Sequence, residues 1–326
     1  MHMDLDDLAK RIAIGERRAL ARGITLVESS RSDHRVQAAH LLAALPQDRQ
    51  ALRIGMSGTP GVGKSTFIES FGMMLTGQGL RVAVLAVDPS SARSGGSILG
   101  DKTRMDRLAR DPKAFIRPSP SQTHLGGVAR RTREAVALCE GAGFDVVLIE
   151  TVGVGQSETV VAQMSDLFML LLAPAGGDEL QGVKRGIMEM ADIILVNKAD
   201  GDLKPVAMRT CADYSGALRL MRKRSQDPET FPKAMMVSAL QEQGLQDAWA
   251  QMQELNTWRR ENGFFDGTRS AQAQYWFEED LRAALLAKLD QRAVKDEMRR
   301  LGGKVASGAI DPAVAAAQML SVLRGS

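Results

Sequence analysis

The sequence predicts an α/β fold in which a mostly parallel central sheet is flanked by helices, with helical extensions at both ends of the chain. Two observations lead to this prediction. Between residues 50 and 258, seven short apolar runs alternate with amphipathic helical stretches. These runs are continuously hydrophobic, which is typical of parallel strands that are covered on both faces.

The seven expected strands follow one another between stretches of helical periodicity, so that strand and helix alternate along the central region. They are LRIGMS (52–57), RVAVLAVD (81–88), KAFIRP (113–118), DVVLIET (145–151), LFMLLLAP (167–174), IILVNK (193–198) and KAMMVSA (233–239).

The amino-terminal segment has helical spacing and no strand signal. Leu5, Leu8 and Ile12 recur on one helical face, and the Ala/Leu-rich run that follows ends at Pro46. We therefore expect an N-terminal helical extension over residues 1–49, before the central domain at 50–258.

The carboxy-terminal segment is also expected to be helical, over residues 259–326. It contains FEEDLRAALLAKLDQRAVKDEMRRL (277–301), and GGKVASG (302–308) then predicts a break. Asp311 before Pro312 has the pattern of an N-cap followed by proline at the first helical position, which predicts one last helix.

Composition excludes several classes of protein. The 326 residues are 44% hydrophobic and 25% charged, as in ordinary globular proteins, and the net charge of +3 does not by itself indicate nucleic-acid binding. No apolar run is long enough for a membrane span, and the acidic start MHMDLDDLAKR is unlike a signal peptide, so we expect a cytoplasmic protein.

Cys139 and Cys211 form no CxxC pattern, and we expect two buried, inert thiols.

A phosphate-binding motif follows the first expected strand. GTPGVGKS matches GxxxxGK[ST] and precedes TFIESFGMML, which has helical spacing. Backbone N–H groups of such a loop point at phosphate oxygens, Lys64 reaches the outer phosphates, and Ser65 can ligate Mg²⁺. A glycine-rich turn with a surface lysine is the alternative, but the flanking strand and helix favour a P-loop NTPase. The residues expected at the phosphates are Gly58, Gly61, Val62, Gly63, Lys64, Ser65 and Thr66.

The base preference is predicted farther along, where IILVNKAD places Asn197, Lys198 and Asp200 in an NKxD pattern. A carboxylate at Asp200 can accept hydrogen bonds from N1 and the exocyclic amino group of guanine. Adenine offers no such pair of donors, and an unpaired buried carboxylate is costly. The alternative is a polar strand end that caps a helix. Ser238 and Ala239 follow the next strand, where guanine-binding proteins of this type place a backbone contact, so GTP is favoured over ATP.

Carboxylates occur near the ends of the strands between these two motifs. Asp88 and Glu150 end strands, and Asp101 lies in SGGSILGDKTRM. Because parallel strands open on one edge of the sheet, we expect the three acids near the phosphates. Each alone could also be a loop charge or a helix cap, and for Asp101 that alternative stays open. Gly153 is placed to donate a backbone N–H to the γ-phosphate, so hydrolysis would release its loop.

Together these segments resemble the MeaB/ArgK/MMAA family of P-loop GTPases, which are auxiliary proteins of adenosylcobalamin-dependent methylmalonyl-CoA mutase. The resemblance covers residues 50–258 in an unbroken order of motifs. It implies a guanine-nucleotide-driven chaperone that helps to load the cofactor, protects the mutase and aids reactivation, and that forms a homodimer through the carboxy-terminal extension. Which acyl-CoA mutase is served stays open. The segments are SGTPGVGKST, VDPSS, SGGSILGDKTRM, ETVGVGQSE, GGDELQGVKRGIMEMAD and NKAD.

The resemblance also implies roles position by position. The segment from Gly176 to Gly186 becomes a switch that couples the nucleotide to the mutase, although the residues alone favour a glycine-bounded helix start. The implied roles are catalysis by Lys64, Asp88, Asp101 and Glu150, Mg²⁺ ligation by Ser65, Asp88, Asp101 and Glu150, and guanine recognition by Asn197, Lys198 and Asp200.

One position departs from Ras-like GTPases. Val154 follows Gly153, where Ras-like proteins have the glutamine that orients water, and Gln156 comes two positions later. We therefore expect slow intrinsic hydrolysis, completed by a partner or a dimer neighbour.

Three alternative functions predict sequence features that can be compared with this chain. A metallochaperone GTPase would carry clustered histidines or CxxC, and the four histidines are dispersed. A small-molecule kinase needs a second substrate pocket, of which the sequence gives no sign. An RNA-linked GTPase is suggested by a basic segment, but its single aromatic residue is Phe115, and a solvated face or a dock for an acidic partner explains it equally. We expect neither a nucleic-acid nor a membrane partner. The basic residues are Lys102, Arg104, Arg107, Arg110, Lys113, Arg117, Arg130, Arg131 and Arg133.

Overall fold

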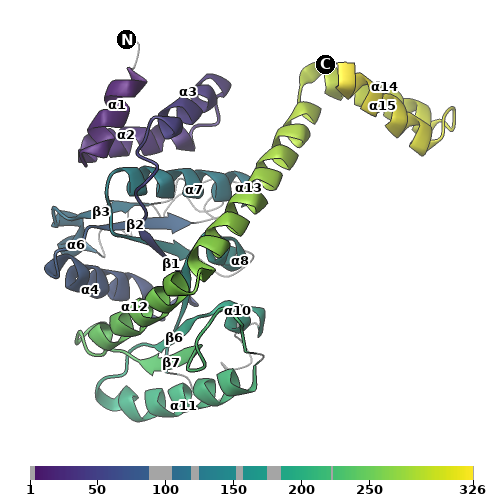
Figure 1. Ribbon diagram of the computed structural model, residues 1–326. Coiled ribbons are helices and arrows are strands. Elements are labelled where there is room, and N and C mark those ends of the chain that lie inside the picture. Colours follow the sequence, from purple (N-terminus) through teal and green to yellow (C-terminus); the bar gives the residue numbers. More distant parts are fainter. Residues whose placement is uncertain are drawn as a thin grey trace. The chain divides into compact units, whose positions relative to one another are not determined.

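The computed structural model describes residues 4–87, 105–118, 125–151, 157–174, 185–221 and 223–325 (Figure 1). Contacts within the chain divide it into two compact units, residues 1–270 (unit 1) and residues 271–326 (unit 2). The three-part division expected from the sequence, at 49/50 and 258/259, stays a prediction.

Unit 1 is built on a seven-stranded sheet with the strand order β3-β2-β4-β1-β5-β6-β7. Every pairing between neighbouring strands is parallel. All seven expected strands are therefore confirmed, and so is the α/β fold. The strands are β1 (Leu52–Ser57), β2 (Val82–Val87), β3 (Ala114–Arg117), β4 (Val146–Thr151), β5 (Leu167–Leu172), β6 (Ile193–Val196) and β7 (Lys233–Met236).

Helices connect these strands and lie on both faces of the sheet (Figure 1). In unit 1 they are α1 (Leu5–Ala13), α2 (Arg17–Glu28), α3 (Ser32–Ala43), α4 (Lys64–Gly77), α6 (Asp106–Arg110), α7 (Leu125–Gly141), α8 (Ser157–Ala162), α10 (Arg185–Met190), the short helix η2 (Gly201–Leu203), α11 (Lys204–Leu220) and α12 (Leu245–Glu261), and α13 (Phe264–Leu289) begins there.

The main core lies between one face of the sheet and helices α4 and α12. Alternate residues of β1, such as Ile54, point into this core with Phe67 and Phe71 of α4 and Trp249 of α12. The rings of Phe71 and Trp249 meet edge to face, with centroids 6.0 Å apart. On the other face α7 packs on β2, and α8 packs on β1 and β4. Coverage on both faces explains why every residue of β4 and β5 is buried.

The N-terminal helices pack on each other and on α7. At Gly23 of α2 an added Cβ would lie 3.2 Å from Leu138 Cδ2, so the two helices approach closely there. Arg35 of α3 donates two hydrogen bonds to the Glu134 carboxylate of α7, at 2.9 and 2.6 Å. The segment expected to be helical thus forms part of unit 1.

Two arginines, one buried and one half-buried, attach the end of α12 and the start of α13 to the amino edge of the sheet. Arg259 pairs with Asp192 and Asp227, and its Nη1 donates to the carbonyl of Asp166 at 2.7 Å. Arg269 pairs with the Asp166 carboxylate just before β5. This edge is opposite to the one that carries the sequence motifs, so these ion pairs support the fold and not the site.

Unit 2 contains the rest of α13, α14 (Arg292–Ala306) and α15 (Pro312–Gly325). The last two helices form a small core of Val294, Leu301, Ala315 and Met319. The Asp311 carboxylate accepts a hydrogen bond from the Ala313 N–H at 2.7 Å, which confirms the expected N-cap. The expected break at 302–308 was placed too early, because α14 continues to Ala306.

The two thiols differ in burial. Cys139 is fully buried, and burial raises the pKa of its thiol. Cys211 is only half-buried, so the expectation of two buried thiols was wrong for this residue. Among the described residues, none of the helices has the length and hydropathy that crossing a membrane requires. The cytoplasmic location stays a prediction.

Candidate functional site: a nucleotide-binding edge

The phosphate loop lies between the end of β1 and the start of α4. Gly63 has φ +90°, a left-handed conformation that a side chain disfavours. At Gly58 an added Cβ would lie 2.4 Å from the carbonyl oxygen of Leu171 in β5, so only glycine fits there. Gly61 also has a positive φ. This backbone brings N–H groups to the amino terminus of α4, which is an arrangement that binds phosphate.

Lys64 is the first residue of α4, and its side chain turns back over the phosphate loop. Its Nζ donates to the carbonyl of Gly58 at 2.7 Å and to that of Thr59 at 3.4 Å. Ser65 and Thr66 follow on the first turn of the same helix, half-buried and exposed respectively. The ammonium group and both hydroxyls expected at the phosphates therefore share one helix terminus.

Asn197 joins the phosphate loop to the loop after β7. Its Nδ2 donates to the carbonyl of Val62 at 2.9 Å, and its Oδ1 accepts a hydrogen bond from the Ala239 N–H at 3.0 Å. Lys198 adds a second connection, because its Nζ donates to the carbonyl of Gly61 at 2.7 Å. The NKxD residues and the phosphate loop, far apart in sequence, thus form one site.

Asp200 lies beside Ser238, as the sequence predicts for two parts of a base pocket. The Ser238 hydroxyl donates to Asp200 Oδ2 and accepts a hydrogen bond from the Gln241 N–H at 3.1 Å. An antiparallel bridge between Ser238 and Gln243 closes this loop. The carboxylate is half-buried and held by one oxygen, so Oδ1 can accept hydrogen bonds from a base.

Backbone strain concentrates at the same loops. Among the described residues, Lys198 and Glu242 are the only non-glycine residues with positive φ, at 58° and 55°. Such conformations cost energy and persist where the surrounding structure holds them, which is common at functional sites. This feature points to the base loops independently of the sequence pattern.

Glu150 is the described member of the expected acid group. It lies at the end of β4, opposite Met56 of β1 and Ala86 of β2, and it is buried. Next to it, the Thr151 hydroxyl donates to Ser57 Oγ at 3.2 Å. The other expected residues of this part, Asp88, Asp101 and Gly153, lie outside the described residues, as do Val154, Gln156 and residues 176–184.

The Mg²⁺ assignment therefore stays a prediction. Within the described ranges, no three His, Cys, Asp or Glu side chains lie together as a metal site would require. The predicted set contains two acids beyond those ranges. Two members are described, Ser65 at the start of α4, which follows β1, and Glu150 near the end of β4, which is adjacent to β1 in the sheet. Both supply oxygen donors, which Mg²⁺ prefers.

Ser70 of α4 belongs to the site's framework and was not expected from the sequence. Its hydroxyl donates to the carbonyl of Ala239 at 2.7 Å. The bridging role of Asn197 was also missed, since NKxD suggested contact with the base alone. A serine on the otherwise apolar buried face of TFIESFGMML was the available signal for Ser70.

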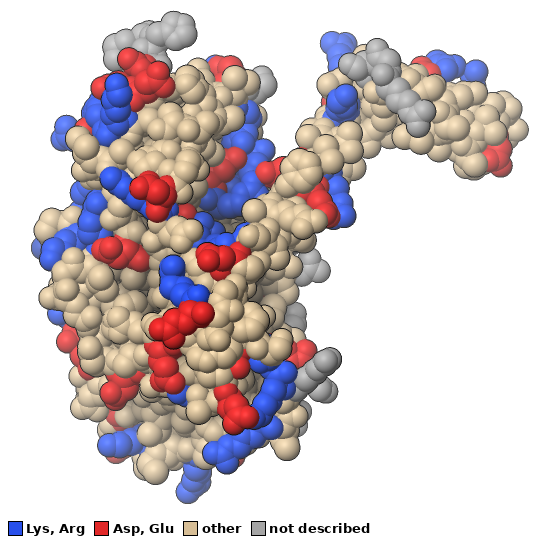
Figure 2. All heavy atoms as spheres, in the orientation of Figure 1, with Lys and Arg blue, Asp and Glu red and all other residues tan. Residues whose placement is uncertain are grey.

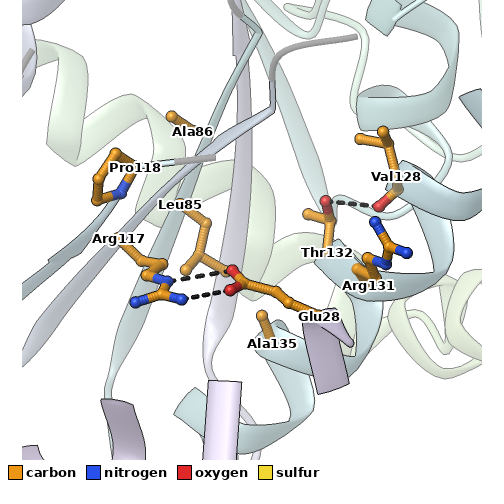
Figure 3. Close-up of a pocket in the computed structure, with 9 residues that line it drawn as sticks. All are labelled: Glu28, Leu85, Ala86, Arg117, Pro118, Val128, Arg131, Thr132 and Ala135. Carbon is orange, nitrogen blue, oxygen red and sulfur yellow. Dashed lines mark hydrogen bonds and ion pairs between the residues drawn. The ribbon is translucent and has the colours of Figure 1, made fainter. Parts of the chain in front are cut away.

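A small pocket adjoins the same edge between α2, the ends of β2 and β3, and α7 (Figure 3). Its wall includes Ala86, which lies opposite Glu150 in the sheet. In Figure 3 Arg117 and Glu28 face each other across it, joined by two hydrogen bonds that connect β3 with the N-terminal helices. The buried Arg131 lines the pocket from α7.

The basic segment noted in the sequence is partly neutralised by acids from elsewhere. Arg107 pairs with Glu242, and Arg117 pairs with Glu28. On the face shown in Figure 2, blue and red atoms of unit 1 are interspersed. The described part of the segment therefore contains paired and buried arginines, as well as exposed ones.

The parallel sheet, the glycine loop capping α4 and the carboxylate loop tied to it define this protein as a P-loop nucleotide-binding protein of the GTPase type. The family model described as "Methylmalonyl Co-A mutase-associated GTPase MeaB" matches residues 20–295. The chain belongs to this family of GTPases, which implies guanine-nucleotide binding.

Individual relatives agree with this assignment. The chain is 46% identical over 332 residues to the mouse protein "Methylmalonic aciduria type A homolog, mitochondrial", covering 98% of this chain and 80% of the relative. It is 46% identical over 286 residues to "GTPase ArgK" of Escherichia coli, covering 87% and 86%. A solved structure titled "Crystal structure of LAO/AO transport system kinase" has a TM-score of 0.76 and 35% identity, covering 99% of both chains.

Proposed function

We propose that this GTPase is a chaperone of an adenosylcobalamin-dependent methylmalonyl-CoA mutase, and that it assists cofactor loading, protection and reactivation of that enzyme. The observation that carries the proposal is the family match over residues 20–295, whose description names a mutase-associated GTPase. The name of the mouse relative refers to methylmalonic aciduria, which supports a partner enzyme that acts on a methylmalonyl compound.

In this proposal, the phosphate loop and Lys64 bind the β- and γ-phosphates. Negative charge on the γ-phosphoryl oxygens must be stabilised during transfer to water, and a fixed ammonium group does this without reorganisation. Mg²⁺, when bound, would neutralise phosphate charge, and its proposed ligands are Ser65, Asp88, Asp101 and Glu150. The proposed phosphate contacts are Gly58, Gly61, Val62, Gly63, Lys64, Ser65, Thr66 and Gly153.

The base pocket is proposed to recognise guanine through Asp200. The hydrogen bond from Ser238 fixes one carboxylate oxygen, which supports a defined orientation of the other toward N1 and the amino group. Lys198 and Asn197 hold this loop against the phosphate loop and would flank the base. The backbone of Ser238 and Ala239 would complete the pocket.

Hydrolysis by the isolated protein is proposed to be slow, because Val154 replaces the residue that orients water in Ras-like proteins. The mutase would then act by ordering the switch segments, since a partner can shift an equilibrium only by binding its states differently. The segment from Gly176 to Gly186 is proposed to provide this coupling.

We also propose that the protein is a homodimer through its carboxy-terminal extension. Phe277, Leu281 and Leu285 recur every four residues on α13 and are 67%, 49% and 56% exposed. This spacing places them on one helical face. The small core between α14 and α15 contains four buried residues and does not include this stripe of α13. Exposed apolar patches of this kind mark protein contacts. A second copy presents the same stripe and can pair with it symmetrically.

Size-exclusion chromatography with light scattering tests both proposals. We expect the protein alone to have the mass of two chains. With methylmalonyl-CoA mutase we expect a complex, and the amount of complex should differ between the nucleotide-free, GDP and GTP-analogue states. Leu281→Asp should give single chains, whereas Ala283→Asp, exposed on the opposite side of α13, should not. An acyl-CoA enzyme without cobalamin is the control partner. A mass of one chain for the unaltered protein contradicts the dimer, and no complex in any nucleotide state contradicts the chaperone role.

A further inference from the structure

We infer that Ser70 is a positioning residue for guanine binding: its hydroxyl fixes the carbonyl of Ala239, and thereby the loop that contacts the base. The inference rests on the proposed role of Ser238 and Ala239 in base recognition. It adds a residue of the phosphate-loop helix to the determinants of base affinity.

The geometry of this contact is that of a buried, fully formed hydrogen bond. Ser70 lies on α4, six residues after Lys64, and is 7% exposed. Its Oγ donates to the carbonyl oxygen of Ala239 at 2.7 Å, across 169 residues of sequence. Ala239 is 1% exposed, so water is a poor substitute for this donor. Loss of the hydroxyl would leave a buried acceptor without a partner.

Ala239 is held on both sides of its Cα. Its N–H donates to Asn197 Oδ1 at 3.0 Å, and Asn197 in turn donates to the carbonyl of Val62 in the phosphate loop. Its carbonyl accepts the bond from Ser70 on the helix that continues that loop. Both anchors therefore lead to the phosphate-binding element, and together they set the distance between the base loop and the phosphates.

Beyond Ala239, the loop has few buried contacts of its own. Leu240 is 78% exposed, and Glu242 has a left-handed backbone. Without the bond from Ser70, the carbonyl of Ala239 would lose its anchor. The hydrogen bond from the Ala239 N–H to Asn197 would then be the one that remains. We therefore expect a displaced or mobile base loop in a protein that keeps its fold, because one unpaired buried acceptor costs less than the total free energy of unfolding of a typical domain.

A purely structural role for Ser70 makes a different prediction, which a matched control separates. Thr76 lies on the same helix, is buried, and donates its hydroxyl to Asp111 Oδ2 at 2.7 Å, with no partner in the base loop. Ser70→Ala and Thr76→Val each remove one buried hydroxyl from α4. If Ser70 only supports the helix, the two variants should behave alike.

The experiment measures GDP affinity by fluorescent-nucleotide competition, tripolyphosphate affinity by the same competition, GTP turnover, and thermal melting. Tripolyphosphate is the probe of the phosphate loop because it carries no base. For Ser70→Ala we expect GDP affinity to fall and the KM for GTP to rise, each by about 5-fold to 10-fold, which is the contribution of one buried hydrogen bond. Tripolyphosphate affinity and kcat should change less than about 2-fold. Thr76→Val should leave GDP affinity, tripolyphosphate affinity and GTP turnover nearly unchanged and alter only thermal melting. Ser70→Thr, which keeps the hydroxyl, should bind GDP with nearly the affinity of the unaltered protein.

Three results overturn the inference. Unchanged GDP affinity in Ser70→Ala removes the positioning role, and an equal loss of GDP and tripolyphosphate affinity assigns Ser70 to general support of the fold. Failure of the unaltered protein to prefer GDP over ADP overturns the proposed base pocket together with this inference. That outcome is distinct from the first two, in which the unaltered protein selects guanine normally.

Discussion

Replacing Lys64 with alanine should lower GTP turnover by about 100-fold or more, which is the effect of removing one preorganised charge-stabilising group from a transition state. The side chain lies over the phosphate loop, with its ammonium group bonded to the carbonyls of Gly58 and Thr59. A γ-phosphate bound in that loop would meet this group directly. The variant therefore lacks the fixed cation at the position where charge develops.

Single-turnover and steady-state phosphate release measure this effect, and competition with fluorescent GDP reports binding separately. Lys10→Ala is the matched control, because Lys10 is an exposed lysine of α1, away from the phosphate loop. It should hydrolyse GTP at the unaltered rate. Turnover of the Lys64→Ala variant at the level of this control would remove Lys64 from the mechanism.

Replacing Asp200 with asparagine should weaken guanine-nucleotide binding by about 100-fold or more, because the site then presents a donor where guanine also has one. Xanthosine nucleotides should bind better to the variant than to the unaltered protein, since xanthine carries an oxygen in place of the amino group. An asparagine oxygen can still accept the hydrogen bond from Ser238, so the loop should keep its position.

Competition between GDP and xanthosine diphosphate measures the change in preference. Asp202→Asn makes the same substitution at an exposed residue two positions later and should leave the preference unchanged. If Asp200→Asn also keeps the unaltered preference for GDP, the carboxylate does not read the base. Another part of the loop must then select guanine.

The sheet was predictable because each strand carries its own signal. A continuous apolar run such as β4 or β5 reports burial on both faces from local sequence alone, and all seven runs became strands. The break after α14 was less predictable. Gly302 and Gly303 have low helix propensity, yet Leu301 and Val305 pack on α15 from either side of them and keep the segment helical.

The candidate site was predictable where a short motif contains the chemistry. Spacing alone predicted Lys64, Ser65 and the NKxD residues as members of the site, and the structure brings them to one edge of the sheet. The bonds that bring these motifs together were not predictable, since they join distant positions: Asn197 to Val62 across 135 residues, and Ser70 to Ala239 across 169. No pattern within one segment specifies a partner at that separation, because the fold brings the two residues together.

We expect the mutase to act as the trigger of GTP hydrolysis by this protein. If GTP changes the affinity for the mutase, the mutase must change the affinity for GTP by the same factor. Faster hydrolysis is expected in addition, because the mutase is proposed to favour the active arrangement of the site. The segment GGDELQGVKRG ends in glycines and carries Lys184 and Arg185, which can form contacts that differ between nucleotide states.

Steady-state GTP turnover, measured with and without an adenosylcobalamin-dependent acyl-CoA mutase, distinguishes a triggered GTPase from a free-standing hydrolase. We predict slow turnover alone and faster turnover with the mutase. Alanine at Lys184 or Arg185 should leave the basal rate within a few-fold of normal and remove most of the stimulation. No stimulation by any such mutase, or full stimulation that survives both substitutions, would contradict the proposed coupling.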